Sequence, residues 1–112
     1  MEINCEQLDG NIYKINLKGR MDIQGNADID LKFSGMTASP HLFFIIDLSE
    51  VNFIASIGIR TLLVNTKAIH NRGGKIAILN PDDQVKKILL MAGIDMIIPI
   101  VDTLDLALAA IQ

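Results

Sequence analysis

Residues 47–63 (DLSEVNFIASIGIRTLL) change their hydrophobic pattern twice, and this change constrains the fold more than any other feature of the chain. They follow an apolar run within residues 41–46, which is typical of a strand covered on both faces. The polar residues 49–52 then predict a short loop. From Ser56 onwards the apolar residues recur at helical spacing, so the segment predicts a strand, a loop and a helix in which Ser56 occupies the first turn.

The two faces of this predicted helix differ in character. The inward stripe is expected to consist of Ile59, Leu62, Leu63, Thr66 and Ile69. The opposite face carries Ile57, Thr61, Val64 and Ala68, bordered by Arg60, Asn71 and Arg72. Exposed helix faces usually carry more charge than this one. The second face is therefore either a docking surface for a partner or a surface that another part of the same chain buries.

The strand–loop–helix segment resembles the hallmark of the STAS domain family (sulphate transporter and anti-sigma-factor antagonist), particularly its small single-domain bacterial members. The family pattern is D-L-S-x-V-x-F-(I/L/M)-D-S-x-G-(I/L), in which the second serine is phosphorylated. The matching residues are Asp47-Leu48-Ser49, Val51, Phe53-Ile54 and Ser56-Ile57-Gly58-Ile59. The resemblance thus implies that Ser56 is the phosphorylation site. One position departs from the family, because Ala55 replaces the acid that precedes the serine.

The chain before this segment predicts a hairpin followed by one helix. Residues 2–18 indicate two strands joined by a two-residue turn at Asp9-Gly10. Residues 24–37 fit both strand and helix periods, and the resemblance favours a helix. Residues 37–40 predict a loop in which the final proline restricts Ser39 to an extended conformation.

The chain after this segment continues the alternation. Residues 75–79 predict a buried strand, and Asn80 is expected to cap the helix that follows it. Residues 97–101 predict an edge strand, since Pro99 lacks a donor, and Asp102 is expected to cap a final helix. We therefore expect an α/β fold with an N-terminal β-hairpin and then alternating helices and strands, which form a mixed sheet packed against helices. This agrees with the STAS fold, and the resemblance covers essentially the whole chain.

Composition limits the classes of function. A chain of 112 residues is expected to form one STAS domain, residues 1–112. It shows neither a signal peptide nor an apolar span that predicts membrane insertion. A net charge of −3 with 4% aromatic residues argues against a nucleic-acid surface. The one cysteine, Cys5, indicates a reducing compartment and is expected to be a half-buried hydrophobe.

Catalytic and metal sites find little support in the sequence. His41 and His70 have no metal-ligand spacing with each other or with Cys5, and no nucleotide-binding glycine pattern is present. We therefore expect no enzyme activity, no metal and no cofactor.

Two residues allow a structural and a functional interpretation. Ser56 would be a suitable N-cap, which stabilises a helix by roughly 1 kcal/mol, but the resemblance favours phosphorylation. Asp22 would likewise cap the next helix. It also ends the sequence Gly19-Arg20-Met21-Asp22, which is similar to a G-x-(L/M)-D element of the family whose acid lies near the phosphorylation loop. The two roles of Asp22 are compatible.

The resemblance implies a cytoplasmic, bacterial switch of the anti-sigma-factor antagonist type, which regulates transcription through protein binding. The dephosphorylated form would bind a kinase-type anti-sigma factor, which would phosphorylate Ser56 with its own ATP, and a separate phosphatase would reverse this. The residues expected to bind the partner are Asp22, Asn52, Ala55, Ser56, Ile57, Gly58, Arg60, Thr61, Val64 and Ala68. Two alternatives stay open: a constitutive binding module (a transporter subunit or signalling scaffold) and a domain that senses a nucleotide or lipid. The sequence predicts no oligomeric state.

Overall fold

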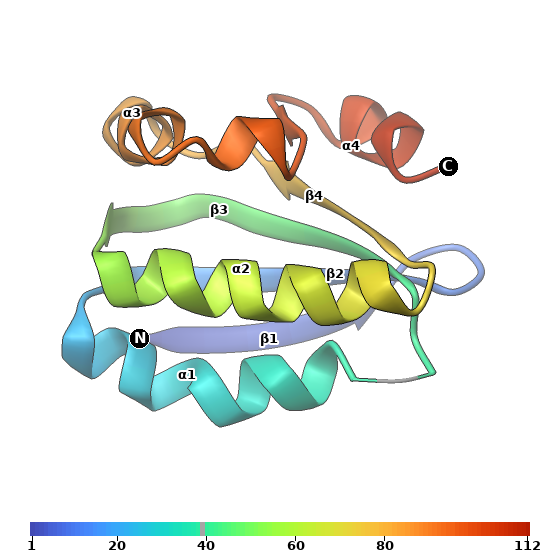
Figure 1. Ribbon diagram of the computed structural model, residues 1–112, viewed down its shortest axis with the longest axis horizontal. Coiled ribbons are helices and arrows are strands. Elements are labelled where there is room, and N and C mark those ends of the chain that lie inside the picture. Colours follow the sequence, from blue (N-terminus) through green and yellow to red (C-terminus); the bar gives the residue numbers. More distant parts are fainter. Residues whose placement is uncertain (39) are drawn as a thin grey trace.

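Helices and strands alternate along the chain after an N-terminal hairpin (Figure 1). The computed structural model describes residues 1–38 and 40–112, so the expectation of an extended Ser39 lies outside the described residues. The elements are β1 (Glu2–Gln7), β2 (Ile12–Met21), α1 (Ile23–Met36), β3 (Phe43–Ile54), α2 (Ser56–Asn71), β4 (Lys75–Leu79), α3 (Asp83–Met91), the 3₁₀ turn η1 (Ile94–Met96), β5 (Ile100–Val101) and α4 (Leu104–Ala110).

The strands form one five-stranded mixed sheet in the order β1-β2-β3-β4-β5. β1 and β2 are antiparallel, and each later neighbouring pair is parallel. The predicted α/β architecture is therefore confirmed, as is the choice of a helix for residues 24–37. The mixed sheet follows from the connections, because a tight turn joins antiparallel strands whereas helical crossovers join parallel ones.

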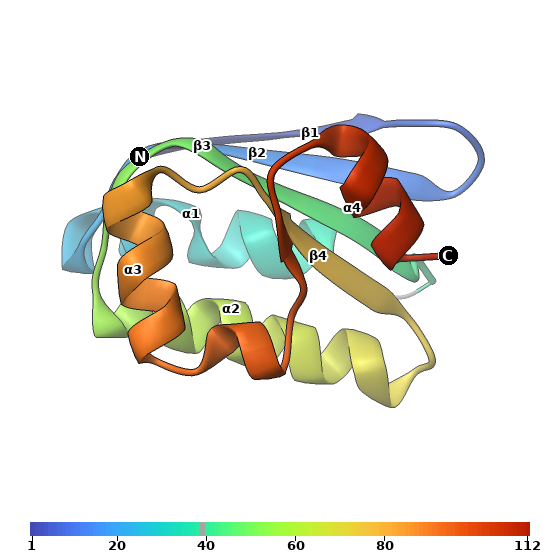
Figure 2. The same cartoon turned by 90° about the horizontal axis from the view of Figure 1, so that it is seen from above.

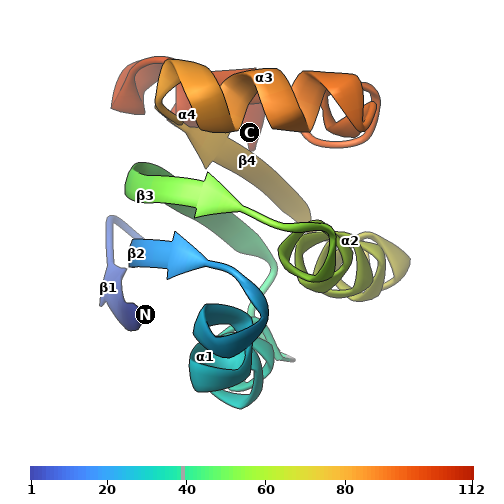
Figure 3. The ribbon, with the colours of Figure 1, turned by 90° about the vertical axis from the view of Figure 1, so that its left-hand side faces the viewer.

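The sheet separates two hydrophobic layers of unequal size. Phe44 and Ile46 of β3 point into the main core, where residues of α1, α2 and α3 pack, including Phe33 of α1. Ile45 points to the opposite face and packs with Ala107 of α4. Figures 2 and 3 show α1 and α2 on one side of the sheet and α4 on the other. Burial of each large apolar side chain stabilises the fold by about 1.5–3 kcal/mol, so the layer under α1, α2 and α3 contributes most.

The part of the sheet that α4 does not cover carries a ladder of polar side chains, here called the open sheet face (Asn4, Glu6, Lys14, Asn16 and Asp47). Nζ of Lys14 lies 3.1 Å from Oδ2 of Asp47 and 3.4 Å from Oε1 of Glu6, and it donates to Oδ1 of Asn16 at 2.9 Å. Nδ2 of Asn16 donates in turn to Oδ1 of Asn4 at 2.8 Å. These side chains satisfy one another, as half-buried polar groups on a sheet require.

The Lys14–Asp47 pair shifts the pKa of both groups. Burial by itself would raise the pKa of Asp47, but hydrogen bonds from Ser49 and the nearby Lys14 ammonium outweigh it and hold that pKa below its usual range. Burial would likewise lower the pKa of Lys14, yet the Asp47 and Glu6 carboxylates raise it above its usual value. Both shifts favour the charged forms, so the ion pair stabilises the folded state at neutral pH.

The turn of the hairpin is longer than the sequence predicted. The amide of Leu8 donates to the carbonyl of Ile12 at 2.8 Å, so three residues form the turn and Gly10 adopts a positive φ of 66°. The predicted two-residue turn was therefore wrong, although its glycine supplies the left-handed conformation that the turn needs. Cys5 in β1 is exposed, which corrects the expectation of a half-buried side chain.

The predicted loop at residues 49–52 is part of β3, which continues to Ile54. The pairing with β2 extends through this segment but shifts register twice, with Lys18 opposite Glu50 and Gly19 opposite Val51. Because of these irregularities the polar residues Ser49 and Glu50 face solvent while Val51 stays buried. The polar pattern that predicted a loop therefore marks an irregular strand.

The C-terminal elements begin later than predicted. Asp82, and not Asn80, caps α3, and its Oδ1 accepts a hydrogen bond from the amide of Val85 at 2.8 Å. Thr103, and not Asp102, caps α4. The last strand is reduced to the two residues of β5, at the edge of the sheet, because the amides of Ile97 and Ile98 donate to the carbonyl of Ile94 in the turn that follows η1. Among the described residues, we find no helix whose length and apolar character would allow it to cross a membrane.

Candidate functional site

The ends of β2 and β3 lie side by side and lead into α1 and α2 (Figure 3). A hydrogen bond of 2.9 Å from the amide of Ala55 to the carbonyl of Met21 joins the two ends. Immediately after Met21, Asp22 caps α1, because its Oδ1 accepts from the amide of Gly25 at 2.8 Å. Its Oδ2 accepts from Nε of Arg20 at 3.2 Å. The predicted capping role of Asp22 is confirmed. Asp22 directly follows Met21, whose carbonyl accepts the hydrogen bond from Ala55, the residue before Ser56.

Arg20 links this cap to the end of β3. Its guanidinium carbon lies 4.0 Å from the centroid of the Phe53 ring, besides the hydrogen bond to Asp22. Asn52, beside Phe53, is exposed. A guanidinium on an aromatic face stabilises an exposed site by roughly 0.5–1 kcal/mol. Arg20 therefore helps to hold the end of β2 beside the end of β3.

Ser56 is the first residue of α2, and Ala55 occupies the N-cap position. The alternative interpretation of Ser56 as an N-cap is therefore excluded, whereas its predicted position in the first turn is confirmed, and Ala55 offers no side-chain cap. In the described chain, the first hydrogen bonds of α2 run from the amides of Gly58 and Ile59 to the carbonyl of Ala55, at 2.9 and 3.1 Å. The preceding amides, of Ser56 and Ile57, are thus left at the positive end of the helix, beside an exposed serine side chain. This arrangement suits a phosphate group.

The first turn of α2 packs closely on the core through Gly58. A Cβ atom at Gly58 would lie 2.9 Å from Cγ of Met21 and 3.0 Å from Cγ1 of Ile54. Only glycine allows the helix to approach these two side chains so closely. Gly58 is buried, so it positions Ser56 and offers no exposed side surface of its own.

A groove of about 340 Å³ runs between α1 and α2, here called the α1–α2 groove. Its lining residues are Asn26, Asp30 and Ser34 of α1 and Ile57, Arg60, Thr61, Val64 and Asn65 of α2. The groove thus brings together four residues that the sequence predicted to bind a partner (Ile57, Arg60, Thr61 and Val64). The residues of α1 were not among those that the sequence predicted to bind a partner. Their spacing of four residues, Asn26–Asp30–Ser34, is a polar helical stripe that would have placed them on one face.

The outer face of α2 is partly a surface and partly an interhelical contact. Thr61 is 6% exposed and lies beside α1, which fits the alternative that another part of the same chain buries this face. Val64 is 58% exposed and Ile57 36%, and Ala68 is also exposed. The predicted inward stripe of this helix is confirmed by the burial of Leu62, Thr66 and Ile69. Both interpretations of the outer face therefore hold, each for some of its residues.

Buried polar groups lie along the floor of the groove. Oγ1 of Thr37 donates to Oδ1 of Asn65 at 3.1 Å, and Nδ2 of Asn65 donates to the carbonyl of Thr61 at 2.8 Å. Asn26 is also buried, but among the described residues its Oδ1 has no hydrogen-bond partner. The side chain of Asn65 is therefore satisfied, whereas Oδ1 of Asn26 is buried without a partner.

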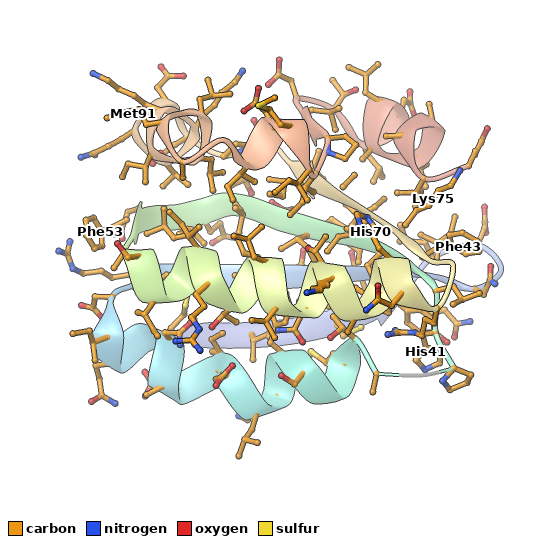
Figure 4. All side chains as sticks on the ribbon, viewed as in Figure 1. His41, Phe43, Phe53, His70, Lys75 and Met91 are labelled. Carbon is orange, nitrogen blue, oxygen red and sulfur yellow. The ribbon has the colours of Figure 1, made fainter. Side chains whose placement is uncertain are left out.

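The remaining candidate reactive residues lie apart. Figure 4 shows His41 before β3 and His70 in the last turn of α2, on different elements. Within residues 1–38 and 40–112, no three histidine, cysteine or acidic side chains gather closely enough to hold a metal ion. Although Cys5 is exposed, neighbouring side chains partly desolvate its thiol, and this desolvation, followed by the Glu6 carboxylate, raises the pKa of the thiol, which disfavours a reactive thiolate.

Comparison with known proteins places this geometry in a family. The sequence profile of the STAS domain matches residues 2–107. A candidate anti-sigma factor antagonist from Thermotoga neapolitana is 31% identical over 65 residues, a match that spans only 58% of this chain and 58% of the relative. The structure of an anti-sigma factor antagonist from Mycobacterium paratuberculosis superposes with a TM-score of 0.88 at 22% identity, over 98% of this chain and 92% of the other.

The fold also resembles a structure determined in a phosphorylated state. The Bacillus cell fate determinant SpoIIAA in its phosphorylated form superposes with a TM-score of 0.72 at 19% identity, over 96% of this chain and 97% of the other. At these identities the two superpositions establish the shared fold. Together with the profile match over nearly the whole sequence, they show that this chain belongs to the STAS domain family.

Proposed function

We propose that this chain is a non-enzymatic protein-binding switch of the anti-sigma factor antagonist type, controlled by phosphorylation of Ser56. Its partner would be a kinase-type anti-sigma factor that binds the unmodified form and transfers the phosphate from its own ATP, and a phosphatase would restore binding. The chain would thereby regulate transcription in a bacterial cytoplasm. It would act as one domain, residues 1–112.

One observation carries this proposal: Ser56 is exposed at the start of α2, directly before a residue that lines the α1–α2 groove. The partner surface would comprise Ile57, Arg60 and Val64 of the groove, with the exposed Ala68 beyond it. Its border, at the ends of β2 and β3, would include Asp22, Asn52 and Ala55. A modification of Ser56 would therefore lie within the contact area.

The surroundings of Ser56 favour a phosphate in the free protein. Phosphorylation adds about −1.5 to −2 charges, and a helix N-terminus stabilises an anion by roughly 0.3–1 kcal/mol. Arg60 follows Ser56 by four residues on the same helix, a spacing that brings side chains together. Its guanidinium is therefore available to hold the phosphate, and Ala55 contributes no repelling carboxylate.

Identification of the modified residue tests the first step of this proposal. The protein would be incubated with ATP and a kinase-type anti-sigma factor from the same organism, then analysed by mass spectrometry. We expect one phosphate, located on Ser56 and absent from the Ser56→Ala variant. Ser49→Ala is the matched control, because Ser49 belongs to the same segment, and it should leave the modification unchanged. No modification, or a phosphate on Ser49, would refute the proposal.

A further inference from the structure

A second groove lies on the other side of α2, between this helix and η1, the orange turn that follows α3 in Figure 2; it is here called the α2–η1 groove. Its volume is about 360 Å³, and its lining residues are Leu63, Thr66, Lys67, His70 and Asn71 of α2 and Ile97, which follows η1. The α2–η1 groove shares no lining residue with the α1–α2 groove. It is therefore a separate cavity, outside the partner surface proposed above.

The wall of the α2–η1 groove is mostly apolar. Leu63 is half-buried and packs against the main core, whereas Ile97 is 49% exposed. Sites for small molecules are concave, hold roughly 300–1,000 Å³ and combine an apolar lining with a few polar groups. An exposed apolar side chain in such a cavity gains free energy when a ligand covers it. The groove therefore has the size and the lining that the apolar part of a small molecule needs.

The ionisable groups of the α2–η1 groove are basic. Lys67 and His70 are exposed, lie one helical turn apart on α2, and form no ion pair within the described residues. No acidic residue is among the described residues that line the groove, although the whole chain has a net charge of −3. His70 also lies where a cation interacts with the helix dipole, but Lys67 precedes the last turn. Charge complementarity therefore favours an anionic group on the ligand.

We propose that the α2–η1 groove binds a small anionic amphiphile, namely a carboxylate that carries a short aliphatic chain. Leu63 and Ile97 contact the chain, Lys67 forms an ion pair with the carboxylate, and a ring N–H of His70 donates to it. A free small molecule is favoured over a protein segment, because the apolar wall and both basic groups belong to one cavity of a small ligand's size. This inference goes beyond the proposed function and does not depend on Ser56.

Titration of the free protein with octanoate, followed by the NMR resonances of its methyl groups, tests the site. We expect octanoate to shift the methyl resonances of Leu63 and Ile97 with one saturable affinity. Octylammonium has the same chain with the opposite charge, and acetate has the charge without the chain, so each should bind at least about tenfold more weakly. Equal affinity for octanoate and octylammonium would overturn the inference, because the groove would then bind a chain of either charge.

Lys67→Gln removes the proposed ion pair at an exposed position, so the variant is expected to fold. Its affinity for octanoate should fall about fivefold or more, because the carboxylate loses its cation. Lys32→Gln is the matched control, since Lys32 is exposed on α1, does not line the α2–η1 groove, and contributes the same charge. It should bind octanoate like the wild-type protein. An unchanged affinity in Lys67→Gln would refute the assignment of the anion to this groove.

Ile97→Ala tests the apolar part of the site and should weaken octanoate binding about threefold or more, because it removes a contact with the chain. Leu106→Ala is its control, since Leu106 is 54% exposed on α4, outside the α2–η1 groove, and this variant should bind like wild type. Equal shifts at Leu106 and Ile97 in the wild-type protein would mean adsorption to any exposed apolar side chain and would overturn the inference. Ser56→Ala should bind octanoate with wild-type affinity, so this inference and the proposed function fail separately.

Discussion

The open sheet face and the α1–α2 groove both carry half-buried or buried polar side chains, but the two regions differ in whether these side chains have partners within the domain. On the open sheet face Lys14 contacts Asp47, Glu6 and Asn16, so each polar group has a partner within the domain. In the groove, Oδ1 of Asn26 has no partner among the described residues. Paired groups contribute to stability, whereas a buried unpaired group costs stability. The open sheet face therefore stabilises the domain, and we propose that the groove, which begins at Ile57 next to Ser56, takes part in recognition.

Removal of Lys14 should produce the largest effect on folding. Lys14→Met leaves the Asp47 carboxylate, whose side chain is 17% exposed, without its ammonium partner. We expect the free energy of unfolding to fall by about 2–3 kcal/mol, measured by urea denaturation, with unchanged partner affinity. Lys18→Met is the matched control, because the Lys18–Glu50 pair is exposed and 3.8 Å long, and its loss should cost less than about 0.5 kcal/mol. Equal losses would mean that the Lys14 ladder is not structural.

A charge introduced into the α1–α2 groove should lower partner affinity and leave stability nearly unchanged, the reverse of the Lys14 substitution. Val64→Glu should lower partner affinity by about 2 kcal/mol, roughly thirtyfold, because the carboxylate would be desolvated on binding. Its stability should stay within about 0.5 kcal/mol of wild type, since the side chain is 58% exposed. Calorimetry with the anti-sigma factor measures the affinity. Leu106→Glu on α4, at 54% exposure, is the control, and equal weakening by both variants would place the interface elsewhere.

Ala55→Asp should have a smaller effect, on both the stability of the protein and the phosphorylation of Ser56. Ala55 is an N-cap without a side-chain hydrogen bond, so an aspartate there should stabilise the protein by about 1 kcal/mol in thermal unfolding. Its charge beside Ser56 should also change the phosphorylation rate. Ala55→Asn caps the helix without adding charge and separates the two effects. Identical phosphorylation rates for the aspartate and asparagine variants would show that the missing acid is electrostatically silent.

The smallest expected effect is the acid sensitivity of the open sheet face. The pKa of Asp47 lies below its usual range in the folded state, so its stabilising contribution is present above the unfolded pKa, near 4. It is lost as the pH falls through the lower folded pKa. Urea midpoints between pH 7 and pH 2.5 should therefore fall less in Lys14→Met than in the wild-type protein. The same pH dependence in both would contradict the role assigned to the ion pair.

The periodicity of the sequence predicted the hairpin and the inward stripe of α2 because those elements depend on local patterns. Residues 24–37 fit both strand and helix periods, so the helix α1 was predicted from the family resemblance. The periodicity did not predict that β3 runs to Ile54, since that extension depends on irregular pairing with β2, far away in the sequence. The caps of α3 and α4 were displaced by two residues and one residue because neighbouring side chains have similar capping ability.

The sequence placed Ser56 in the first turn of a helix and Val64 on its exposed side, but it did not reveal the groove. The burial of Thr61 and Asn26 depends on how α1 packs against α2, and this packing cannot be predicted from the residue pattern of either helix alone. The absence of a side-chain cap at Ala55 was also not visible, because a serine at the start of a helix is equally compatible with the N-cap and the first helical position.

The comparison of the affinities of unmodified and Ser56-phosphorylated protein for one anti-sigma factor tests the central claim most directly. Both forms should melt at nearly the same temperature, because the start of α2 tolerates an anion. Calorimetry should show that phosphorylation weakens binding at least tenfold, since the dianion must lose its water inside the contact area, and Ser56→Ala should bind like the unmodified form. Equal affinity of the phosphorylated and unmodified proteins would contradict the claim that phosphorylation of Ser56 controls partner binding at the α1–α2 groove.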